Sequence, residues 1–506
     1  MSKRKEDGSV VPDSSVVSTT YAPHLQVKDF FQREPVIQNT WENTVEYIAV
    51  PRTAFTQKKA TFEIPQGTMG DYQCMYVGDA KLQLVVKIAD KDGNPPPKSF
   101  DTALIPIDCF PQMLIRSVGF TVQNTPVGSI EDGGYNLNAF TYNLLGNGCN
   151  RRYGASEMNG AYISSGGTQQ SLHLDFSENF RRMELFATWF AKKPGVQTVD
   201  EDTDEEEEVS GGDFQKKRKK VTTKYGWKYK NESVAFYADV LTDFSSTDLP
   251  LPPRCAVRYE FEFNKPNFYF LAESPADAEQ YMLYIEDINL IIPTRDLAPP
   301  LMRKLLESMK SSPLTYRMRH TDVIKRVIPS GETSFLVSDL KLGETTPDRI
   351  IACFVPVSSW DGELKTNPLD FQCHWGLGED AFHLTSCDLT LRDISLEQEP
   401  VPRLCQFHLS AFRRLYKYMG QENENSEMFI NRKDFKYGNF FLMWDLTQDR
   451  RAYDTSSRHP TQKGYLKLHV KFNKRTTVPM YIMIMREFHS ILRLNHDRRV
   501  VYQETA

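Results

Sequence analysis

Short segments in which apolar and polar residues alternate recur along most of the chain. Clear examples are residues 81–88 (KLQLVVKI), 257–263 (VRYEFEF) and 466–472 (LKLHVKF). Alternation with a period of two puts successive side chains on opposite faces of a β-strand, so that one face can be buried. The sequence Asp92-Gly93-Asn94, shortly after the first segment, is typical of a turn. The pattern predicts a protein built mainly of β-strands.

A few segments depart from simple alternation. Residues 112–123 (QMLIRSVGFTVQ) form an apolar run that we interpret as one strand or a pair of strands. Residues 478–485 (VPMYIMIM) form another apolar run that we interpret as a strand. Residues 301–309 (LMRKLLESM) place apolar side chains at helical spacing between flanking prolines. Residues 135–146 and 407–420 also have helical spacing, and each ends at a glycine suited to the position after a helix. We therefore expect short helices between some of the strands.

Two features of the first half recur in the second half, in the same order. Residues 257–265 (VRYEFEFNK) match residues 466–474 (LKLHVKFNK), with apolar residues at corresponding positions and the same last three residues. A strand followed by a short helix also recurs, at 118–146 and at 388–420. Repeats of this kind predict two related β-domains in tandem.

The composition agrees with a β-rich protein of more than one domain. The chain has 506 residues, too many for one hydrophobic core, and its 23 Tyr, 31 Phe and 29 Pro favour strands joined by turns. A net charge of −5 argues against a polycation that coats nucleic acid. The eight cysteines form no CxxC pair, and the sequence has neither a secretory signal nor an apolar run long enough to span a membrane. We expect reduced thiols and a soluble, intracellular product.

The predicted organisation is an arm followed by two domains. Residues 1–35 are polar and lack periodicity, which indicates a flexible N-terminal arm. The first domain is expected at 36–297, a linker helix at 298–313 and the second domain at 314–506. Residues 198–223 interrupt the first domain with charge too dense to bury, so we expect a mobile surface loop there.

The charged loop contains the candidate functional residues. An acidic block at 200–208 (DEDTDEEEE) precedes a run of five basic residues: Lys216, Lys217, Arg218, Lys219 and Lys220. Such a run is typical of a nuclear-import signal or of a nonspecific contact with nucleic acid. It could equally serve only to balance the acidic block on a solvated loop. Both interpretations remain open on the sequence.

Patterns that indicate catalysis or metal binding are sparse. Cys373-His374 with His383 and Cys387 offers the ligand types that zinc prefers. Adjacent residues of a strand point to opposite faces, however, so buried thiols and ordinary histidines are the favoured interpretation. No GxSxG, HExxH or His-x-His pattern occurs, which argues against an esterase, a zinc protease or a cupin enzyme. Aromatic strands such as 259–263 are interpreted as core and not as a stacking platform. We predict no catalytic, metal or cofactor site.

A spread of short motifs resembles the major capsid proteins of Polinton (Maverick) and adintovirus-like elements. The motifs occur in the same order over most of the chain: Ile64–Ile88 with Asp71-Tyr72, then Asp92-Gly93, Pro106–Val118 (PIDCFPQMLIRSV), Asn136–Leu145, Tyr316–Pro329, Arg349–Val357, Asn367–Phe371 (NPLDF) and Val478–Val501. No single motif is diagnostic, and the resemblance rests on their order and spacing. The charged segment at 198–223 has no counterpart that we can assign in that family.

The resemblance implies an all-β fold of two tandem jelly-roll β-sandwiches, a double jelly roll with short helices in loops. It implies a structural subunit of an icosahedral virion, not an enzyme, with no cofactor. Three copies would form a pseudo-hexameric homotrimeric capsomer that contacts neighbouring capsomers, a penton or minor capsid protein, and packaged DNA nonspecifically. Synthesis in the host cytoplasm, with assembly in the nucleus, would follow. The alternative is a host-retained β-sandwich that binds carbohydrate or a protein partner and no longer forms capsids.

Overall fold

The structure, a computed structural model, describes most of the chain between Trp41 and Gln503. The described residues are 41–97, 100, 104–107, 109–128, 134–145, 190–192, 227–272, 279–338, 340, 345–362, 367–376, 381–396, 407–419, 430, 432, 435, 437–452 and 464–503. The arm predicted at 1–35 and the charged loop predicted at 198–223 lie outside these residues.

Two five-stranded sheets are formed by the first half of the chain. Sheet 1 has the order β1-β14-β5-β11, with β4 also paired to β14, and sheet 2 has the order β2-β3-β12-β7-β8. The strands of sheet 1 are β1 (Glu46–Pro51), β4 (Gln73–Met75), β5 (Lys81–Ala89), β11 (Val234–Asp239) and β14 (Met282–Asp296). Those of sheet 2 are β2 (Ala54–Thr56), β3 (Lys59–Ile64), β7 (Ile115–Val122), β8 (Thr125–Pro126) and β12 (Val257–Phe263).

Two further five-stranded sheets are formed by the second half. Sheet 3 has the order β15-β25-β17-β23, with β26 also paired to β25, and sheet 4 has the order β16-β24-β20-β19, with β21 paired to β20. The strands of sheet 3 are β15 (Leu314–Ile328), β17 (Arg349–Pro356), β23 (Leu442–Asp445), β25 (Met480–Leu494) and β26 (Val500–Gln503). Those of sheet 4 are β16 (Ser334–Ser338), β19 (His374–Trp375), β20 (Phe382–Leu391), β21 (Ile394–Ser395) and β24 (Leu466–Phe472).

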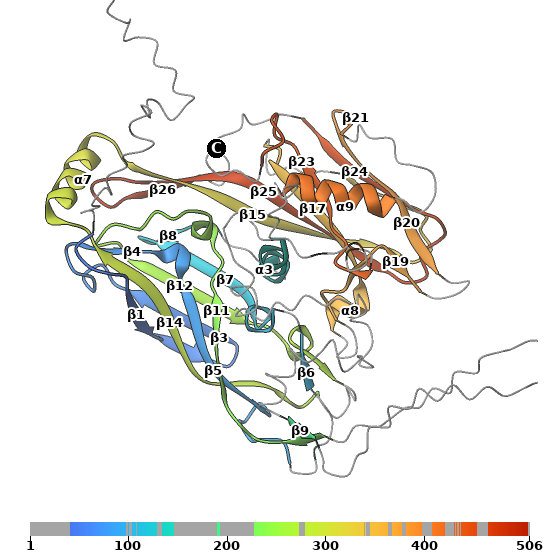
Figure 1. Cartoon of the computed structure of the whole chain (residues 1–506), viewed down its shortest axis with the longest axis horizontal. Helices are drawn as coiled ribbons and strands as arrows, with labels where there is room; N and C mark the ends of the chain where they lie inside the picture. The colour runs from blue at the N-terminus through green and yellow to red at the C-terminus, as the bar shows by residue number, and fades with distance from the viewer. Residues whose placement is uncertain are drawn as a thin grey trace, which may run out of the picture.

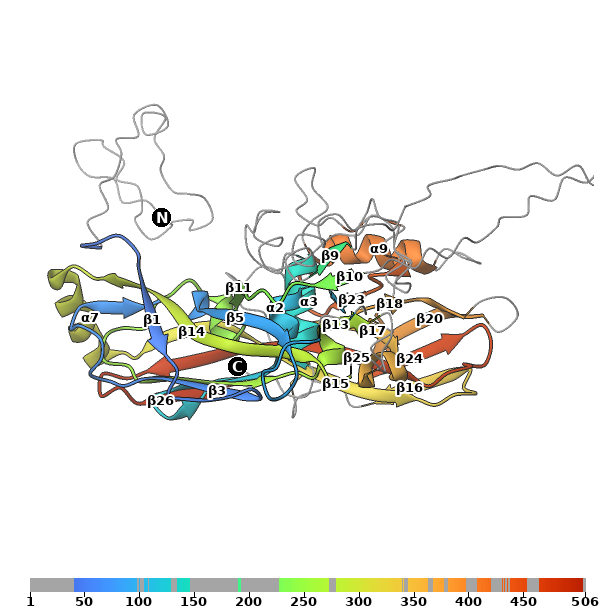
Figure 2. The same ribbon diagram turned by 90° about the horizontal axis from the view of Figure 1, so that it is seen from below.

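Each half is a sandwich of two antiparallel sheets (Figures 1 and 2). Alternate residues of each strand enter the space between the sheets, as in β12, where Tyr259 and Phe261 are buried and Arg258 and Glu260 are exposed. The apolar core is continuous, because one cluster of buried residues extends through both sandwiches. In Figure 1 the long strands β15 and β25 run from the second sandwich along the first, and β26 contacts β8 there.

The two sandwiches have the same strand order, as the sequence repeats predict. In sheets 1 and 3, the first strand of the half lies at one edge, beside the last long strand (β1 beside β14, β15 beside β25). The repeated segments VRYEFEF and LKLHVKF are β12 and β24, and each lies between corresponding neighbours, β3 and β7 in sheet 2 and β16 and β20 in sheet 4. The prediction of two related β-sandwiches in tandem is confirmed.

Short elements connect the strands. Helices are α2 (Phe110–Met113), α3 (Gly134–Leu145), α7 (Pro299–Ser311), α8 (Val357–Asp361) and α9 (Phe407–Tyr418), and the 3₁₀ turns are η1 (Val77–Asp79), η2 (Asp243–Ser246) and η3 (Pro266–Phe268). Three two-stranded ribbons pair β6 (Leu104–Pro106) with β13 (Phe270–Ala272), β9 (Phe190–Lys192) with β10 (Trp227–Tyr229), and β18 (Phe371–Gln372) with β22 (Tyr437–Gly438). Across the described residues, no helix has the length and apolar character needed to cross a membrane.

One local prediction is wrong at its start. The run at 112–123 was expected to be one strand or a pair of strands, and most of it is β7, but its first residues belong to the single turn of α2 and the strand begins only at Ile115. Cys109 starts this turn with a left-handed backbone (φ 55°), and Pro111 follows it near the helix N-terminus. Proline has its φ preset for a first helical turn and lacks the N–H that such a turn leaves unpaired, so Pro111 favours the helix.

Candidate functional site

The cysteine and histidine candidates lie in or next to sheet 4, where three of the four are neighbours and Cys387 is apart from them. His374 and His383 are directly opposite each other on β19 and β20, and their rings stack with centroids 4.6 Å apart. Cys373 Sγ lies 3.9 Å from His374 Nδ1, whereas Cys387 is buried further along β20, opposite Val470 of β24. Among the described residues, no three of His, Cys, Asp and Glu form a group that could hold a metal ion.

The buried cysteines are poorly suited to nucleophilic chemistry. Burial raises the pKa of the Cys74 thiol to about 12 and that of Cys255 to about 11, and it also raises the pKa of Cys353. Because the thiolate is the reactive form, such thiols are inert near neutral pH. They act as small apolar side chains in the core.

The aromatic strands form core, as predicted. Tyr259 and Phe261 of β12 are buried, and the Tyr259 hydroxyl donates a hydrogen bond to the carbonyl oxygen of Val77 at 3.0 Å. Phe441 and Trp444, next to and within β23, are also buried. The five basic candidates at 216–220 lie outside the described residues, so their role stays a prediction.

The contact between the two sandwiches contains a buried carboxylate that the sequence did not single out. Asp243 of η2, only 2% exposed, faces three side chains of sheet 3. His320 Nδ1 lies 3.2 Å from Asp243 Oδ2, and the hydroxyls of Ser490 (3.4 Å) and Tyr502 donate to the same oxygen. Gly128 (φ +52°) lies against this carboxylate, so closely that a Cβ on residue 128 would lie 2.4 Å from Asp243 Oδ1. All three partners of Asp243 therefore come from the other half of the chain.

Further contacts extend this seam between η2 and β15. The Tyr316 hydroxyl donates to the Pro250 carbonyl oxygen at 3.0 Å, and the Tyr316 ring lies 5.4 Å from the ring of Phe244. The backbone N–H of Arg319 donates to Ser246 Oγ at 2.8 Å. Apolar packing together with directional hydrogen bonds fixes the orientation of the two sandwiches.

A second buried charge pair lies on the outer face of sheet 3. Glu487 of β25 accepts two hydrogen bonds from Arg349 of β17, from Nε at 2.7 Å and from Nη2 at 2.8 Å. Arg349 is fully buried, and Met419, just after α9, places its sulfur 3.3 Å from Arg349 Nη1. Arg319 Nη1 lies 3.6 Å from Glu487, and burial lowers the pKa of the Arg319 guanidinium. The Arg349–Glu487 pair links the neighbouring strands β17 and β25, and Met419 packs over it.

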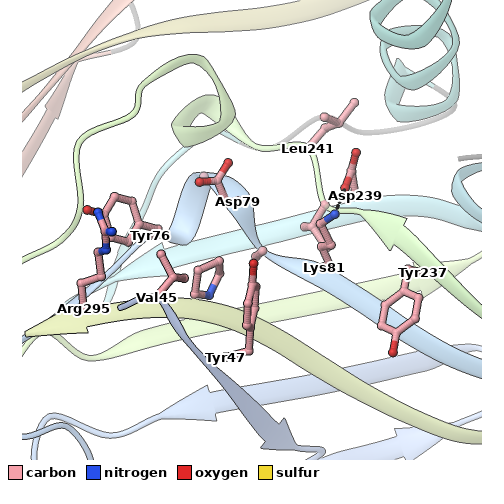
Figure 3. A pocket seen from close by; sticks show the side chains of 13 residues that line it. Val45, Tyr47, Tyr76, Asp79, Lys81, Tyr237, Asp239, Leu241 and Arg295 are labelled. Carbon is pink, nitrogen blue, oxygen red and sulfur yellow. Dashed lines mark ion pairs between the residues drawn. The ribbon is translucent and has the colours of Figure 1, made fainter. Parts of the chain in front are cut away.

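An open hollow of about 440 Å³ lies on the outer face of sheet 1 (Figure 3). It is lined by apolar, aromatic and charged side chains: Val45, Tyr47, Tyr76, Asp79, Lys81, Tyr237, Asp239, Leu241, Pro293 and Arg295, with Gly78, Ala80 and Val240. Figure 3 shows the Lys81–Asp239 ion pair between Tyr47 and Tyr237, with Tyr76 and Arg295 at the other end of the hollow. The mixed lining and open shape suit a contact surface better than an enclosed catalytic pocket.

Comparisons with solved structures identify the fold. The chain is similar to VP54 of PBCV-1, as fitted into a reconstruction of the virophage Sputnik, with a TM-score of 0.52 and 8% identity over 94% of this chain and 99% of that one. It is similar to a chain of the Sputnik virophage (TM-score 0.51, 10% identity, 96% and 93% covered) and of the PBCV-1 capsid (0.50, 10%, 93% and 99%). No protein-family model and no curated protein matches the sequence. The chain therefore has the double jelly-roll fold of these proteins.

Proposed function

We propose that this chain is a major capsid protein, a structural subunit that assembles three at a time into pseudo-hexameric capsomers of an icosahedral shell. The observation that carries the proposal is the tandem pair of sandwiches with matching strand order, in a fold shared along nearly the whole chain with virus capsid structures. Two sandwiches per chain give six in a trimer, which supplies a near-hexagonal building block for a closed shell.

Several features of the described residues support a structural role over an enzymatic one. The acids and bases buried between and beneath the sheets, such as Asp243 and Glu487, are engaged in contacts that hold strands and sandwiches together. The buried thiols have raised pKa values, which suits packing and not catalysis. The large continuous core gives the stiff unit that a shell requires.

The finer assignment follows the sequence motifs. We place the protein with the capsid proteins of Polinton and adintovirus-like elements, with the first jelly roll at 36–297, the linker helix at 298–313 and the second jelly roll at 314–506. Its partners would be other copies of itself, a penton or minor capsid protein, and packaged DNA. Synthesis would be cytoplasmic, and the mature protein would reside in the virion.

The basic run at 216–220 is proposed to direct nuclear import before assembly. Replacing Lys216, Lys217, Arg218, Lys219 and Lys220 with alanine is expected to shift a fluorescent fusion from the nucleus to the cytoplasm, because import receptors bind clustered positive charge. The matched control replaces Lys3, Arg4 and Lys5 and should leave the distribution unchanged. A nuclear signal that survives the first substitution would exclude nuclear import and leave two roles for the run, a nonspecific contact with nucleic acid or charge balance with the acidic block at 200–208.

The proposed assembly is tested by the solution mass of the purified protein. Light scattering after size-exclusion chromatography is expected to give the mass of three protomers of 58.3 kDa each, or closed shells visible by electron microscopy in the same fractions. A monomer that persists across protein and salt concentrations would contradict the proposal. That result would favour a β-sandwich that binds carbohydrate or another protein.

A further inference from the structure

The long strands β15 and β25 continue past the second sandwich as a ribbon that lies along the first sandwich (Figure 1). Strand β26 pairs with the last residues of β25, so the ribbon is three-stranded at its end. Its inner face packs on the first sandwich, where the hydroxyls of Tyr316 and Tyr502 donate hydrogen bonds to residues of the first half. Successive residues of a strand point to opposite faces, so the remaining side chains form an outer face.

The outer face of the ribbon is basic. Arg493 of β25 is directly opposite Thr315 of β15 and Val501 of β26. Arg317 follows two residues after Thr315 and therefore points to the same side, diagonally across from Arg493. Both arginines are exposed, as is Arg499 just before β26. We call this surface, formed by Thr315, Arg317, Arg493, Arg499 and Val501, the arginine face.

Acids do not neutralise the arginine face. Among the described residues, Arg317 and Arg493 form no ion pair, and Arg499 is paired only with Asp497, an exposed neighbour in the same turn, at 3.1 Å. The local surplus of positive charge contrasts with the whole chain, whose net charge is −5. The arginine face therefore offers positive charge that the rest of the described chain leaves available.

Acidic residues further along the same side of the ribbon are engaged with other cations. Glu487 lies 3.6 Å from Arg319, and Asp348 lies 3.5 Å from His489. The loop at 447–452 accepts a hydrogen bond from Arg319 and brings two arginines and one aspartate to this region. These neighbours therefore do not reverse the positive charge of the arginine face.

The outer face of sheet 2 pairs its exposed cations with acids instead. Arg258 contacts both Glu63, at 3.4 Å, and Glu260, and Lys59 contacts Glu262. Opposite charges on neighbouring strands stabilise a sheet, whereas like charges placed close together destabilise it. The arginine face lacks such pairing, so we expect its negative partner to come from outside the chain.

Helix α7 adds positive charge beside the arginine face. Its Met309 sulfur lies 4.0 Å from Arg498 Nη1, so the helix and the β25–β26 turn are neighbours. The exposed charged residues of the helix are three cations and one acid: Arg303, Lys304, Lys310 and Glu307. Figure 1 shows α7 and this turn together at the end of the first sandwich that lies away from β9. The positive charge is thus gathered at one end, as a surface directed toward the interior of a shell would need.

We propose that the arginine face contacts the phosphate backbone of packaged double-stranded DNA. A guanidinium can donate two parallel hydrogen bonds to one phosphate, which makes arginine well suited to this contact. Neighbouring strands are about 5 Å apart and alternate residues of one strand about 7 Å apart, so Arg317 and Arg493 can contact separate phosphates. Contacts to the backbone do not depend on base sequence. The inference rests on the proposed capsid function and assigns a surface to its DNA contact.

The side chains of the arginine face favour DNA over a lipid bilayer. Among the described residues, the large apolar side chain exposed on this face is Val501 alone, at 50%. Insertion at a membrane surface needs a substantial apolar face next to the cations. A flat basic surface with few apolar groups suits a polyanion that stays in water.

Duplex binding measured against salt concentration tests the proposal. The affinity of the purified full-length protein for a fluorescent duplex of mixed sequence is measured by anisotropy from about 50 to 200 mM salt. The double variant Arg317→Gln, Arg493→Gln should reduce the slope of log Kd against log salt by about 2, because each phosphate contact contributes about 0.9. A duplex of unrelated sequence should give the same reduction. The control Lys59→Gln, Arg258→Gln removes equal charge from sheet 2 and should leave the slope unchanged.

Three results would overturn the inference. The first is an equal slope for the wild type and the variant Arg317→Gln, Arg493→Gln. The second is arginine-dependent binding to phosphatidylcholine vesicles that contain phosphatidylserine, without arginine-dependent binding to the duplex, which would assign the face to a membrane. The third is the same pattern with a peptide of the sequence 200–208, which would assign the face to the acidic block of the chain.

The solution mass separates this inference from the proposed function. The variant Arg317→Gln, Arg493→Gln should keep the mass, circular dichroism and unfolding midpoint of the wild type, since both side chains are exposed. Loss of the trimer in this variant would show that the face is a contact between copies, which also overturns the inference. Wild-type trimers that do not bind the duplex would refute the DNA contact alone. A monomeric wild type would instead refute the proposed trimer.

Discussion

Replacing Glu487 with alanine is expected to lower the free energy of unfolding by about 3–5 kcal/mol. The substitution removes the carboxylate that accepts hydrogen bonds from Arg349 Nε and Nη2 at 2.7 and 2.8 Å. Arg349 is fully buried, so water cannot replace the lost carboxylate, and Arg319 loses the same neighbour at 3.6 Å. Chemical denaturation followed by circular dichroism, at one protein concentration, measures the loss.

A surface carboxylate on the corresponding strand provides the matched control. Glu286 of β14 pairs with Lys87 at 2.9 Å, but both side chains are partly exposed, at 33% and 22%. Exposed pairs contribute little because solvent screens them, so Glu286→Ala should cost less than about 1 kcal/mol. Replacing Arg349 and Glu487 together with methionine should restore part of the loss, because the buried Arg349 guanidinium is then removed with its carboxylate and only Arg319 still lacks Glu487. Equal effects of Glu487→Ala and Glu286→Ala would contradict the account.

Alternation predicted the strands well where one face of a sheet is open to solvent. The segment at 257–263 is β12 at the predicted bounds, with Val257, Tyr259, Phe261 and Phe263 buried and Arg258 exposed. A one-residue shift of this strand would expose its apolar side chains, so burial and sequence specify the same register. The repeat of this segment as β24 was equally visible, because it is buried in the same way.

The local sequence pattern did not predict the bounds of elements that are buried by contacts with distant segments of the chain. Residues 478–485 of the sequence were interpreted as a strand, but β25 extends from Met480 to Leu494, and its last residues include Ser490, which faces the first sandwich. A strand buried on both faces has no alternation, so its length cannot be read from periodicity. The turn of α2 was missed for a related reason, since an apolar run alone does not distinguish helix from strand.

The buried charges could not be predicted from the sequence either. Glu487 and Arg349 are separated by 138 residues, and Asp243 and His320 by 77. Taken singly, each is an ordinary charged residue that a sequence places in solvent by default. The tertiary fold alone brings each of these residues to its partner, and no short sequence motif indicates the pairing. The hollow on sheet 1 is hidden for the same reason, because Tyr47 and Tyr237 come from opposite edges of the sheet.

Replacing Asp243 with alanine is expected to cost about 2–4 kcal/mol and to loosen the two sandwiches from each other. His320, Ser490 and Tyr502 all lose the buried carboxylate that they contact from the second half of the chain. A smaller side chain also leaves a gap beside Gly128, whose missing Cβ makes room for the carboxylate. Denaturant unfolding gives the energy, and limited proteolysis should detect earlier separation of the halves.

The control for this substitution is Asp248→Ala, an exposed carboxylate in the same connection, which should change the free energy of unfolding by less than about 0.5 kcal/mol. A double-mutant cycle of Asp243→Ala with His320→Ala then isolates the direct interaction, because independent sites would simply add. Additive losses would mean that Asp243 and His320 stabilise the protein independently, which would leave Ser490 and Tyr502 as its partners across the seam. A coupling of about 1 kcal/mol or more would show that the carboxylate joins the two jelly rolls, on whose fixed orientation a regular shell depends.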